Sequence, residues 1–139
     1  MAAIGTRKLT ATIDGDEVAP EVSKAVITSE ESDSDFVTFE DAARGGSRTY
    51  KLALTIVQDA EADSLWDKVW TAAGTDIPVL VRPYGNAVAS AAQPHFEGEV
   101  TIVEPDGDLL GGEADPSNTA RFVCEVEWTF LEKPTRIVS

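Results

Sequence analysis

The feature that most constrains the fold is a strict alternation of apolar and polar residues close to the C-terminus. In the segment RFVCEVEWTFLEKP, residues 121–134, every second side chain is apolar, namely Phe122, Cys124, Val126, Trp128 and Phe130. Successive side chains of a β-strand point to opposite faces of its sheet, so this period directs one apolar face toward a core. The segment therefore predicts a half-buried strand.

Five further segments show the apolar, β-branched and aromatic patterns of strands. They cover residues 7–13, 17–30, 49–59, 77–83 and 95–104. The side chains expected on their buried faces are Leu9, Ala11, Ile13, Val22, Ile27, Leu52, Leu54, Ile56, Phe96, Val100 and Ile102. Pro20 has no N–H to donate to a ladder, so we expect it at a sheet edge or at a break in its strand.

Between two of these strands, the segment DAEADSLWDKVWTAAG, residues 59–74, changes to the period of a helix. One apolar stripe is formed by Leu65, Trp66, Val69, Trp70 and Ala73. Asp63 or Ser64 is placed to cap the start, and Gly74 to end the helix. A helix this short needs a packing surface, so we expect the two tryptophans to bury it against a sheet.

The predicted order is therefore two strands, a long loop, a strand, a helix and three strands. Short strands separated by Gly and Asp turns favour antiparallel sheets over parallel ones. We expect a mostly β fold, an antiparallel β-sandwich or partly open barrel with one flanking α-helix. The 139 residues are enough for one domain, and we assign residues 1–139 to it.

A long acidic connection stands out between the second and third strands, at about residues 29–48. Its segment SEESDSDFVTFEDAARGGS, residues 29–47, carries six acids and a Gly-Gly pair. Loops of this length inside a compact domain are usually functional or disordered. Phe36, Val37 and Phe39 gain nothing from exposure to solvent, so we expect them to contact either the domain or a neighbouring molecule.

Composition excludes several classes of function. The 25 acids and 11 bases give a formal net charge of −14, which disfavours tight binding of nucleic acid. Cys124 is the only cysteine, so no disulfide forms within the chain. The N-terminus lacks the apolar run of a signal peptide, and no stretch approaches the roughly 20 apolar residues of a membrane span. We expect a soluble protein made in a cytoplasm.

No motif predicts catalysis or a cofactor. His95 is the only histidine, and a structural or surface role is favoured over a zinc site. The segments IDGDE and PDGDLLGGEAD alternate acids as calcium loops do, but neither follows the twelve-residue EF-hand pattern, so ordinary turns are favoured. No nucleophile elbow, phosphate-binding loop or catalytic triad motif is present. We expect no enzymatic activity, no metal and no cofactor.

Two pairs of acids occupy alternate positions of predicted strands, Glu97 with Glu99 and Glu125 with Glu127. The simplest interpretation is a solvated sheet face. Like charges on adjacent strands would destabilise a monomer, so we expect these acids to have a role in an assembly. In a ring of copies these acids would line a lumen and keep a passing polyanion from adhering.

The chain resembles the major tail proteins, the tail-tube subunits, of long-tailed bacteriophages with non-contractile tails, particularly those of actinobacterial hosts. Three segments carry the resemblance. They are YKLALTIVQDAEADSLWDKVWTAAGTDIPVLVRPYG (50–85), HFEGEVTIVE (95–104) and RFVCEVEWTFLEKPTRI (121–137). In that family a strand leads into a helix with paired aromatics, then into a strand bounded by prolines, and an aromatic strand closes the domain.

The resemblance implies a virion protein that assembles in the host cytoplasm into hexameric rings stacked as a tail tube. Double-stranded DNA would pass through its negatively charged lumen into the host without specific binding. The implied partners are other copies of the chain, the tape-measure protein, and the tail terminator and baseplate proteins, with no membrane anchoring. The acidic loop and the extended N- and C-terminal arms would be the assembly elements, with inter-subunit residues Glu30, Glu31, Asp33, Asp35, Phe36, Phe39, Arg44 and Arg48.

Two alternatives remain open at this point. One is another ring-forming virion part of similar fold, such as a tail terminator or connector. The other is a monomeric β-sandwich that binds carbohydrate or protein, with an aromatic such as Trp128 or Tyr84 at its site.

Overall fold

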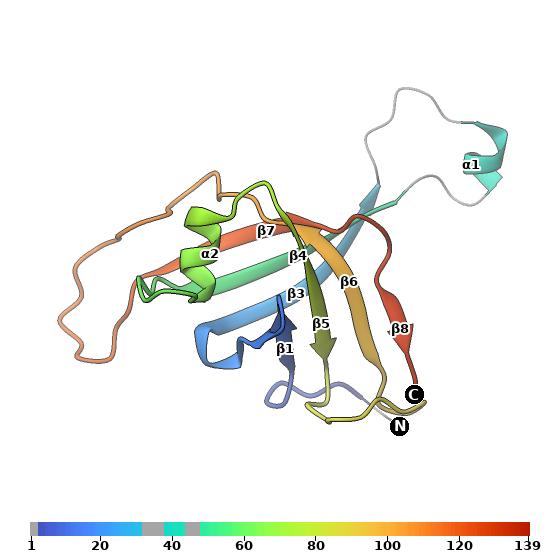
Figure 1. The fold of residues 1–139 in the computed structure, drawn as a ribbon, viewed down its shortest axis with the longest axis horizontal. Coiled ribbons are helices and arrows are strands. Elements are labelled where there is room, and N and C mark those ends of the chain that lie inside the picture. Colours follow the sequence, from blue (N-terminus) through green and yellow to red (C-terminus); the bar gives the residue numbers. More distant parts are fainter. Residues whose placement is uncertain (1–2, 32–37, 44–47) are drawn as a thin grey trace.

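The computed structural model describes residues 3–31, 38–43 and 48–139. Within these ranges the chain forms two antiparallel sheets with a helix beside them, which confirms the predicted sandwich with a flanking helix (Figure 1). The elements are β1 (Thr10–Ile13), β2 (Asp16–Glu17), the 3-10 helix η1 (Ala19–Glu21), β3 (Val22–Glu31), α1 (Phe39–Ala43), β4 (Arg48–Val57), α2 (Leu65–Thr71), β5 (Asp76–Arg82), β6 (His95–Thr101), β7 (Val123–Thr129) and β8 (Thr135–Ile137).

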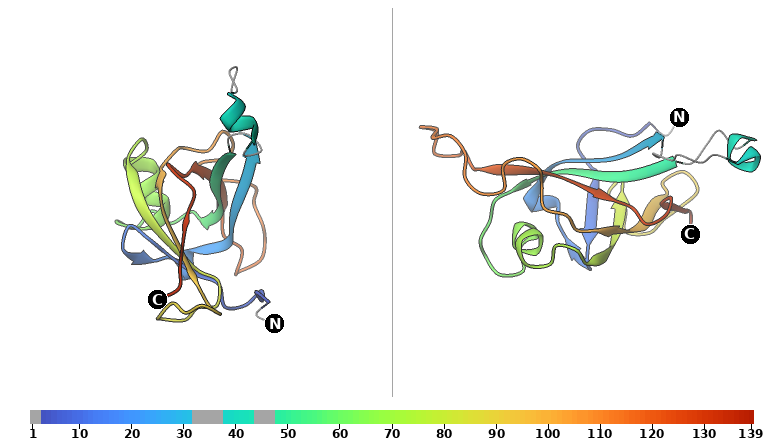
Figure 2. Two further views of the ribbon diagram at one scale, coloured as in Figure 1. Left: turned by 90° about the vertical axis from the view of Figure 1, so that its right-hand side faces the viewer. Right: turned by 90° about the horizontal axis from the view of Figure 1, so that it is seen from above.

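The larger sheet has five strands in the order β2-β1-β5-β6-β8, and the smaller has three in the order β3-β4-β7. The two sheets meet at one corner, where β6 and the end of β7 come together (Figure 2). There Val100 and Phe130 form an isolated antiparallel bridge, and the Leu131 N–H donates to the Glu99 carbonyl at 3.0 Å. The sandwich is therefore joined along one corner.

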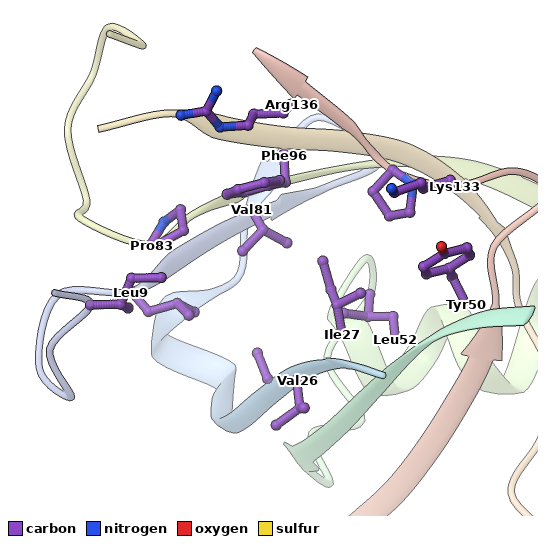
Figure 3. A pocket seen from close by; sticks show the side chains of 13 residues that line it. Leu9, Val26, Ile27, Tyr50, Leu52, Val81, Pro83, Phe96, Lys133 and Arg136 are labelled. Carbon is purple, nitrogen blue, oxygen red and sulfur yellow. The ribbon is translucent and has the colours of Figure 1, made fainter. Parts of the chain in front are cut away.

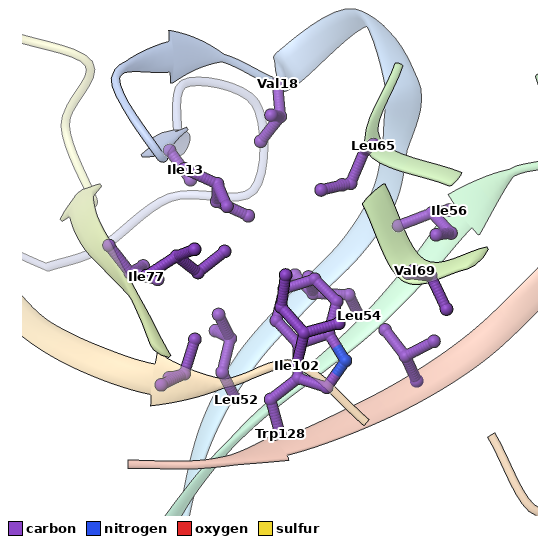
Figure 4. Packing of buried hydrophobic residues seen from close by; sticks show 14 of the residues in the cluster. Ile13, Val18, Leu52, Leu54, Ile56, Leu65, Val69, Ile77, Ile102 and Trp128 are labelled. Carbon is purple, nitrogen blue, oxygen red and sulfur yellow. The ribbon is translucent and has the colours of Figure 1, made fainter. Parts of the chain in front are cut away.

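The core lies between the sheets and is built from the alternating positions that the sequence predicts (Figure 4). Leu52, Leu54 and Ile56 of β4 are at most 2% exposed. Trp128 of β7 is fully buried, and its indole N–H donates to the Val103 carbonyl at 3.1 Å. Because that buried donor is satisfied, the largest core side chain carries no unpaired polar group.

Helix α2 begins where the sequence predicts. Ser64 is the N-cap, and its hydroxyl oxygen accepts a hydrogen bond from the Asp67 N–H at 3.1 Å. The Leu65 N–H, another donor without an intrahelical partner, bonds the Glu21 carboxylate at 3.1 Å. After the helix, Gly74 adopts φ +93°, a conformation that glycine takes without strain, and the chain turns into β5.

The expected apolar stripe of α2 is confirmed for Leu65, Trp66 and Val69, which are buried. It is wrong for Trp70, which is 52% exposed, and for Ala73, which is exposed and follows the end of α2. Trp70 lies one turn after Trp66, and their ring centroids are 5.6 Å apart. Trp66 occupies the position over the sheet, so Trp70 packs against its ring at the flank of the helix.

Three strand predictions also need correction. Leu9 was expected on the buried face of the first strand, but it precedes β1 and is 37% exposed. Phe122 was expected on the buried face of the last long strand, but it precedes β7 and is 46% exposed. Residues 17–30 were expected as one strand with Pro20 at an edge or a break. The break is confirmed, because η1 contains Pro20, but β3 then joins the sheet that does not contain β1. Proline cannot donate to a ladder, and the break allows the chain to cross between sheets.

The C-terminal segment, expected as an extended arm, pairs with β6 as β8. The expected long loop is shorter than predicted, because β3 continues to Glu31 and β4 begins at Arg48. The short helix α1 lies within that connection and projects beyond the ends of β3 and β4 (Figures 1 and 2).

The corner between the sheets yields a test of packing. A Cβ added at Gly98 of β6 would lie 2.8 Å from Cδ1 of the buried Phe130 ring. We expect Gly98→Ala to lower the free energy of unfolding by about 1–2 kcal/mol, since overpacking outweighs the entropy gained by replacing glycine. Urea denaturation measures the difference.

The matched control is Gly107→Ala, because a Cβ there meets no atom within 4 Å. Its stability should stay within about 0.5 kcal/mol of the wild type. Equal stabilities of the two variants would contradict the assigned contact between Gly98 and Phe130.

Candidate functional site

The long edge strand β3 is the first candidate surface. Nine of its ten residues pair on one side with β4, and in the described part of the chain no strand pairs with its other side. An open edge of this length presents a row of backbone donors and acceptors to other chains. Lys24 and Glu30 place charges along the strand, and the ladder shifts register between Val22 and Lys24.

Helix α1 is the second candidate surface. Phe39, its first residue, is 97% exposed, more than any other large apolar side chain of the described ranges. Of the two contacts expected for Phe39, the one with its own domain is therefore not made. Asp33, Asp35, Phe36 and Arg44, which were predicted at the same interface, lie outside the described residues.

Three other residues of the predicted inter-subunit loop belong to strands instead. Glu31 and Arg48 form the last pair of the ladder between β3 and β4. The Arg48 guanidinium donates to the Ser29 hydroxyl oxygen at 3.0 and 3.3 Å. Glu30 forms an ion pair with Lys51 of β4, with 2.6 Å between the carboxylate oxygen and Nζ. These contacts fix the base of the projecting connection on the smaller sheet.

An apolar groove between the two sheets is the third candidate surface (Figure 3). It encloses about 510 Å³, within the usual size range of ligand pockets. Side chains of both sheets point into it. Its lining residues are Ile4, Leu9, Ala25, Val26, Ile27, Tyr50, Leu52, Val81, Pro83, Phe96, Lys133, Pro134 and Arg136.

Cations mark the groove on the side of the C-terminal segment. Lys133 Nζ lies 6.0 Å from the centroid of the Tyr50 ring, and the Arg136 guanidinium donates to the Ala91 carbonyl at 3.2 Å. No acidic side chain is among the described residues that line the groove. The groove therefore differs in charge from the chain as a whole, which carries a net charge of −14.

The groove was not predicted from the sequence. Its walls are inward-facing positions of several strands, such as Ile27, Leu52 and Val81, whose alternation indicates burial in a core. Alternation does not show where two sheets diverge. The sequence therefore holds no signal that separates the walls of this groove from a closed core.

The four predicted lumen acids do not share one sheet. Glu97 and Glu99 lie on β6 of the larger sheet, and Glu125 and Glu127 lie on β7 of the smaller one. All four are exposed, as predicted. The expected crowding on adjacent strands is wrong, because β5 and β8 flank β6, whereas β4 pairs with β7.

A lysine offsets part of the acidic surface of the smaller sheet. Lys51 of β4 lies 2.6 Å from a Glu30 oxygen on one side and 3.1 Å from a Glu127 oxygen on the other. The hydrogen bonds that Lys51 donates to Glu30 and, with a smaller effect, to Glu127 raise the pKa of Lys51 above its ordinary value. One cation therefore links all three strands across their solvent-facing surface.

Four other residues that the sequence offers for catalysis or metal binding are buried or take part in ion pairs. His95 is 6% exposed, and its Nε2 lies 3.0 Å from the Asn86 carbonyl oxygen. Cys124 is buried in the core, and burial raises the pKa of its thiol. Asp14 and Asp16, from the IDGDE segment, both face the ammonium of Lys68, at 3.7 and 2.9 Å.

Within the described ranges, no group of three or more His, Cys, Asp and Glu side chains is arranged to hold a metal ion. None of the described helices combines the length and hydropathy needed to cross a bilayer. Compared with protein-family models and with curated protein sequences, the chain gives no match. Its candidate surfaces are therefore interpreted from their own chemistry.

The ion pairs of Lys68 predict a dependence of stability on pH. Burial of the ammonium disfavours its charge, but the hydrogen bond and charge of Asp16 and the charge of Asp14 outweigh burial and raise the pKa of Lys68. A raised pKa in the folded state stabilises the protein fully below the unfolded value, and this stabilisation is lost as the pH rises through the folded value.

We expect Lys68→Met, which keeps the apolar stem, to lower the free energy of unfolding by about 1 kcal/mol at neutral pH. The difference from the wild type should shrink in denaturation series carried above the ordinary lysine pKa of 10.5. Lys24→Met, on the exposed edge strand, is the control and should have little effect. A Lys68→Met deficit that stays constant up to alkaline pH would contradict the assignment.

Proposed function

We propose that the chain is a structural subunit that assembles with its own copies into the tail tube of a long-tailed, non-contractile bacteriophage. Three sequence segments resemble that family, and a β-sandwich with a flanking helix is the fold that the resemblance implies. The proposed assembly is a stack of hexameric rings. Its proposed role is to conduct double-stranded DNA from the virion into the host.

The observation that carries the proposal is the unfinished surface of the isolated chain. Phe39 is almost fully exposed on α1, and the adjoining strand β3 leaves one edge unpaired within the described residues. Soluble monomers normally protect long strand edges, because such edges promote association. Identical copies that cover these surfaces for one another would turn that liability into an assembly contact.

The charge of the protein also supports a conduit for DNA. Glu97 and Glu99 are exposed on the outer face of one sheet and Glu125 and Glu127 on that of the other, so either face would present acids to a lumen. The whole chain carries a net charge of −14. A polyanion passing such a surface releases no counterions and is repelled. In the proposed tube, this repulsion lets DNA pass without binding to the wall.

The groove favours one alternative, a monomeric sandwich that binds a ligand. Its volume and apolar lining are those of a ligand site. Trp128, considered as a stacking aromatic for such a site, is fully buried in the core and is not available to a ligand. A tail terminator or connector, which forms one ring and no polymer, is the other alternative.

Electron microscopy of the purified protein tests the proposal. We expect negatively stained samples to show rings or tubes, and light scattering after gel filtration to show mass that rises with concentration. A single ring that never stacks would favour the terminator or connector. A strict monomer at high concentration and across salt conditions would overturn the proposed function.

A second test removes the projecting connection. Because Glu31 and Arg48 are the last pair between β3 and β4, an Asn-Gly turn in place of residues 32–47 should close a regular hairpin. We expect this variant to stay folded, with the circular dichroism and melting temperature of the wild type, and to lose assembly. Assembly that persists without these residues would show that other surfaces hold the copies together.

A further inference from the structure

We propose that α1 of one copy docks in the apolar groove of a second copy, with Phe39 inserted between the two sheets. This inference rests on the proposed self-assembly and names the surfaces that carry it. The groove and the exposed Phe39 of α1 are two apolar features that the described residues leave uncovered, and they occupy different parts of the same chain.

The two surfaces match in size and polarity. Phe39 presents a nearly whole aromatic ring to solvent, whereas the groove offers about 510 Å³ lined mainly by aliphatic and aromatic side chains. The entrance is already partly exposed, at Leu9 and Val26. The side chains that contribute most to binding in protein interfaces lie in well-packed, fully desolvated pockets, and an inserted Phe39 ring would be such a side chain.

The charges of the two surfaces are also complementary. The sequence of α1, FEDAA, places two acids directly after Phe39. Lys133 and Arg136 lie at the groove, and none of its described lining residues is acidic. An inserted Phe39 would bring the acidic helix beside these cations, which favours this orientation.

The occupant is a second copy because the chain does not fill its own groove. Helix α1 projects away from the two sheets, and Phe39 remains 97% exposed (Figures 1 and 2). The contact joins two different surfaces, so it is heterologous. A heterologous contact repeats from copy to copy and produces closed rings or helical stacks, whereas a self-complementary patch would stop at a dimer.

Two single substitutions test the contact. Phe39→Ser removes the anchor, and Leu9→Glu places a carboxylate at the partly exposed groove entrance. We expect each to weaken association about 10- to 100-fold, the loss that corresponds to exposing one buried Phe or Leu side chain. Val88→Ser is the matched control, because Val88 is 75% exposed and does not line the groove.

A mixing experiment separates docking between copies from docking within one chain. The Phe39→Ser protein keeps an intact groove, and the Leu9→Glu protein keeps an intact α1. We therefore expect an equimolar mixture to form discrete 1:1 dimers by sedimentation velocity, through one productive contact, while each protein alone does not. Docking within a single chain predicts no gain on mixing and would overturn the proposal.

Circular dichroism checks that each variant is folded, and Val26→Glu, at the other side of the entrance, replaces Leu9→Glu if that protein does not fold. If Phe39→Ser assembles as the wild type does, the docking proposal fails while the proposed tube subunit stands. If the wild type itself never assembles, both proposals fail.

Discussion

The architecture depends on how the two sheets are joined at one corner. The Phe130 ring packs directly over Gly98, and the bridge between Val100 and Phe130 ties β6 to the end of β7. A side chain at position 98 would displace that ring. Away from this corner the sheets diverge over the inward faces of β3 and β5, and the space between them becomes the groove. One tight contact therefore determines where the sandwich closes and where it stays open.

Polar anchors hold the long connections against this framework. The Gln58 side chain donates to the Gly111 and Val123 carbonyls at 3.1 and 2.9 Å and accepts from the Gly111 N–H at 2.6 Å. The Trp66 indole N–H donates to the Leu109 carbonyl at 2.8 Å. These bonds fasten the acidic segment before β7 to α2 and β4. The connection that carries α1 contrasts with it, because its apolar Phe39 has no such cover.

Local sequence patterns predict the elements well and their partners poorly. The alternation of Leu52, Leu54 and Ile56 identified a buried strand face, because side-chain direction in a strand depends only on position. The cap at Ser64 follows equally local chemistry. Trp70 and Phe122 were misassigned, since whether a periodic apolar residue is buried depends on how much of the facing surface its neighbours already occupy.

For the candidate surfaces too, the sequence predicts local properties and misses long-range arrangement. The sequence indicated exposure of Glu97, Glu99, Glu125 and Glu127, but not that β6 and β7 belong to different sheets. Strand pairing over long sequence separations leaves no periodic signal. The groove was missed for a related reason, because its lining comes from five strands and both terminal segments. Phe39 was singled out because an aromatic side chain inside an acidic connection is locally inconsistent.

Net charge sets the conditions under which the proposed association between copies of this chain would occur. At −14 per copy, long-range repulsion opposes any contact between identical molecules. At physiological ionic strength the Debye length is about 8 Å, so this repulsion is screened beyond the immediate interface. Salt does not weaken an apolar contact by screening. It also weakens the attraction between Lys133 or Arg136 and an acid directly beside it less than it weakens the repulsion between distant charges. Association of so acidic a chain therefore requires short-range contacts, and the proposed docking of α1 in the groove would supply them.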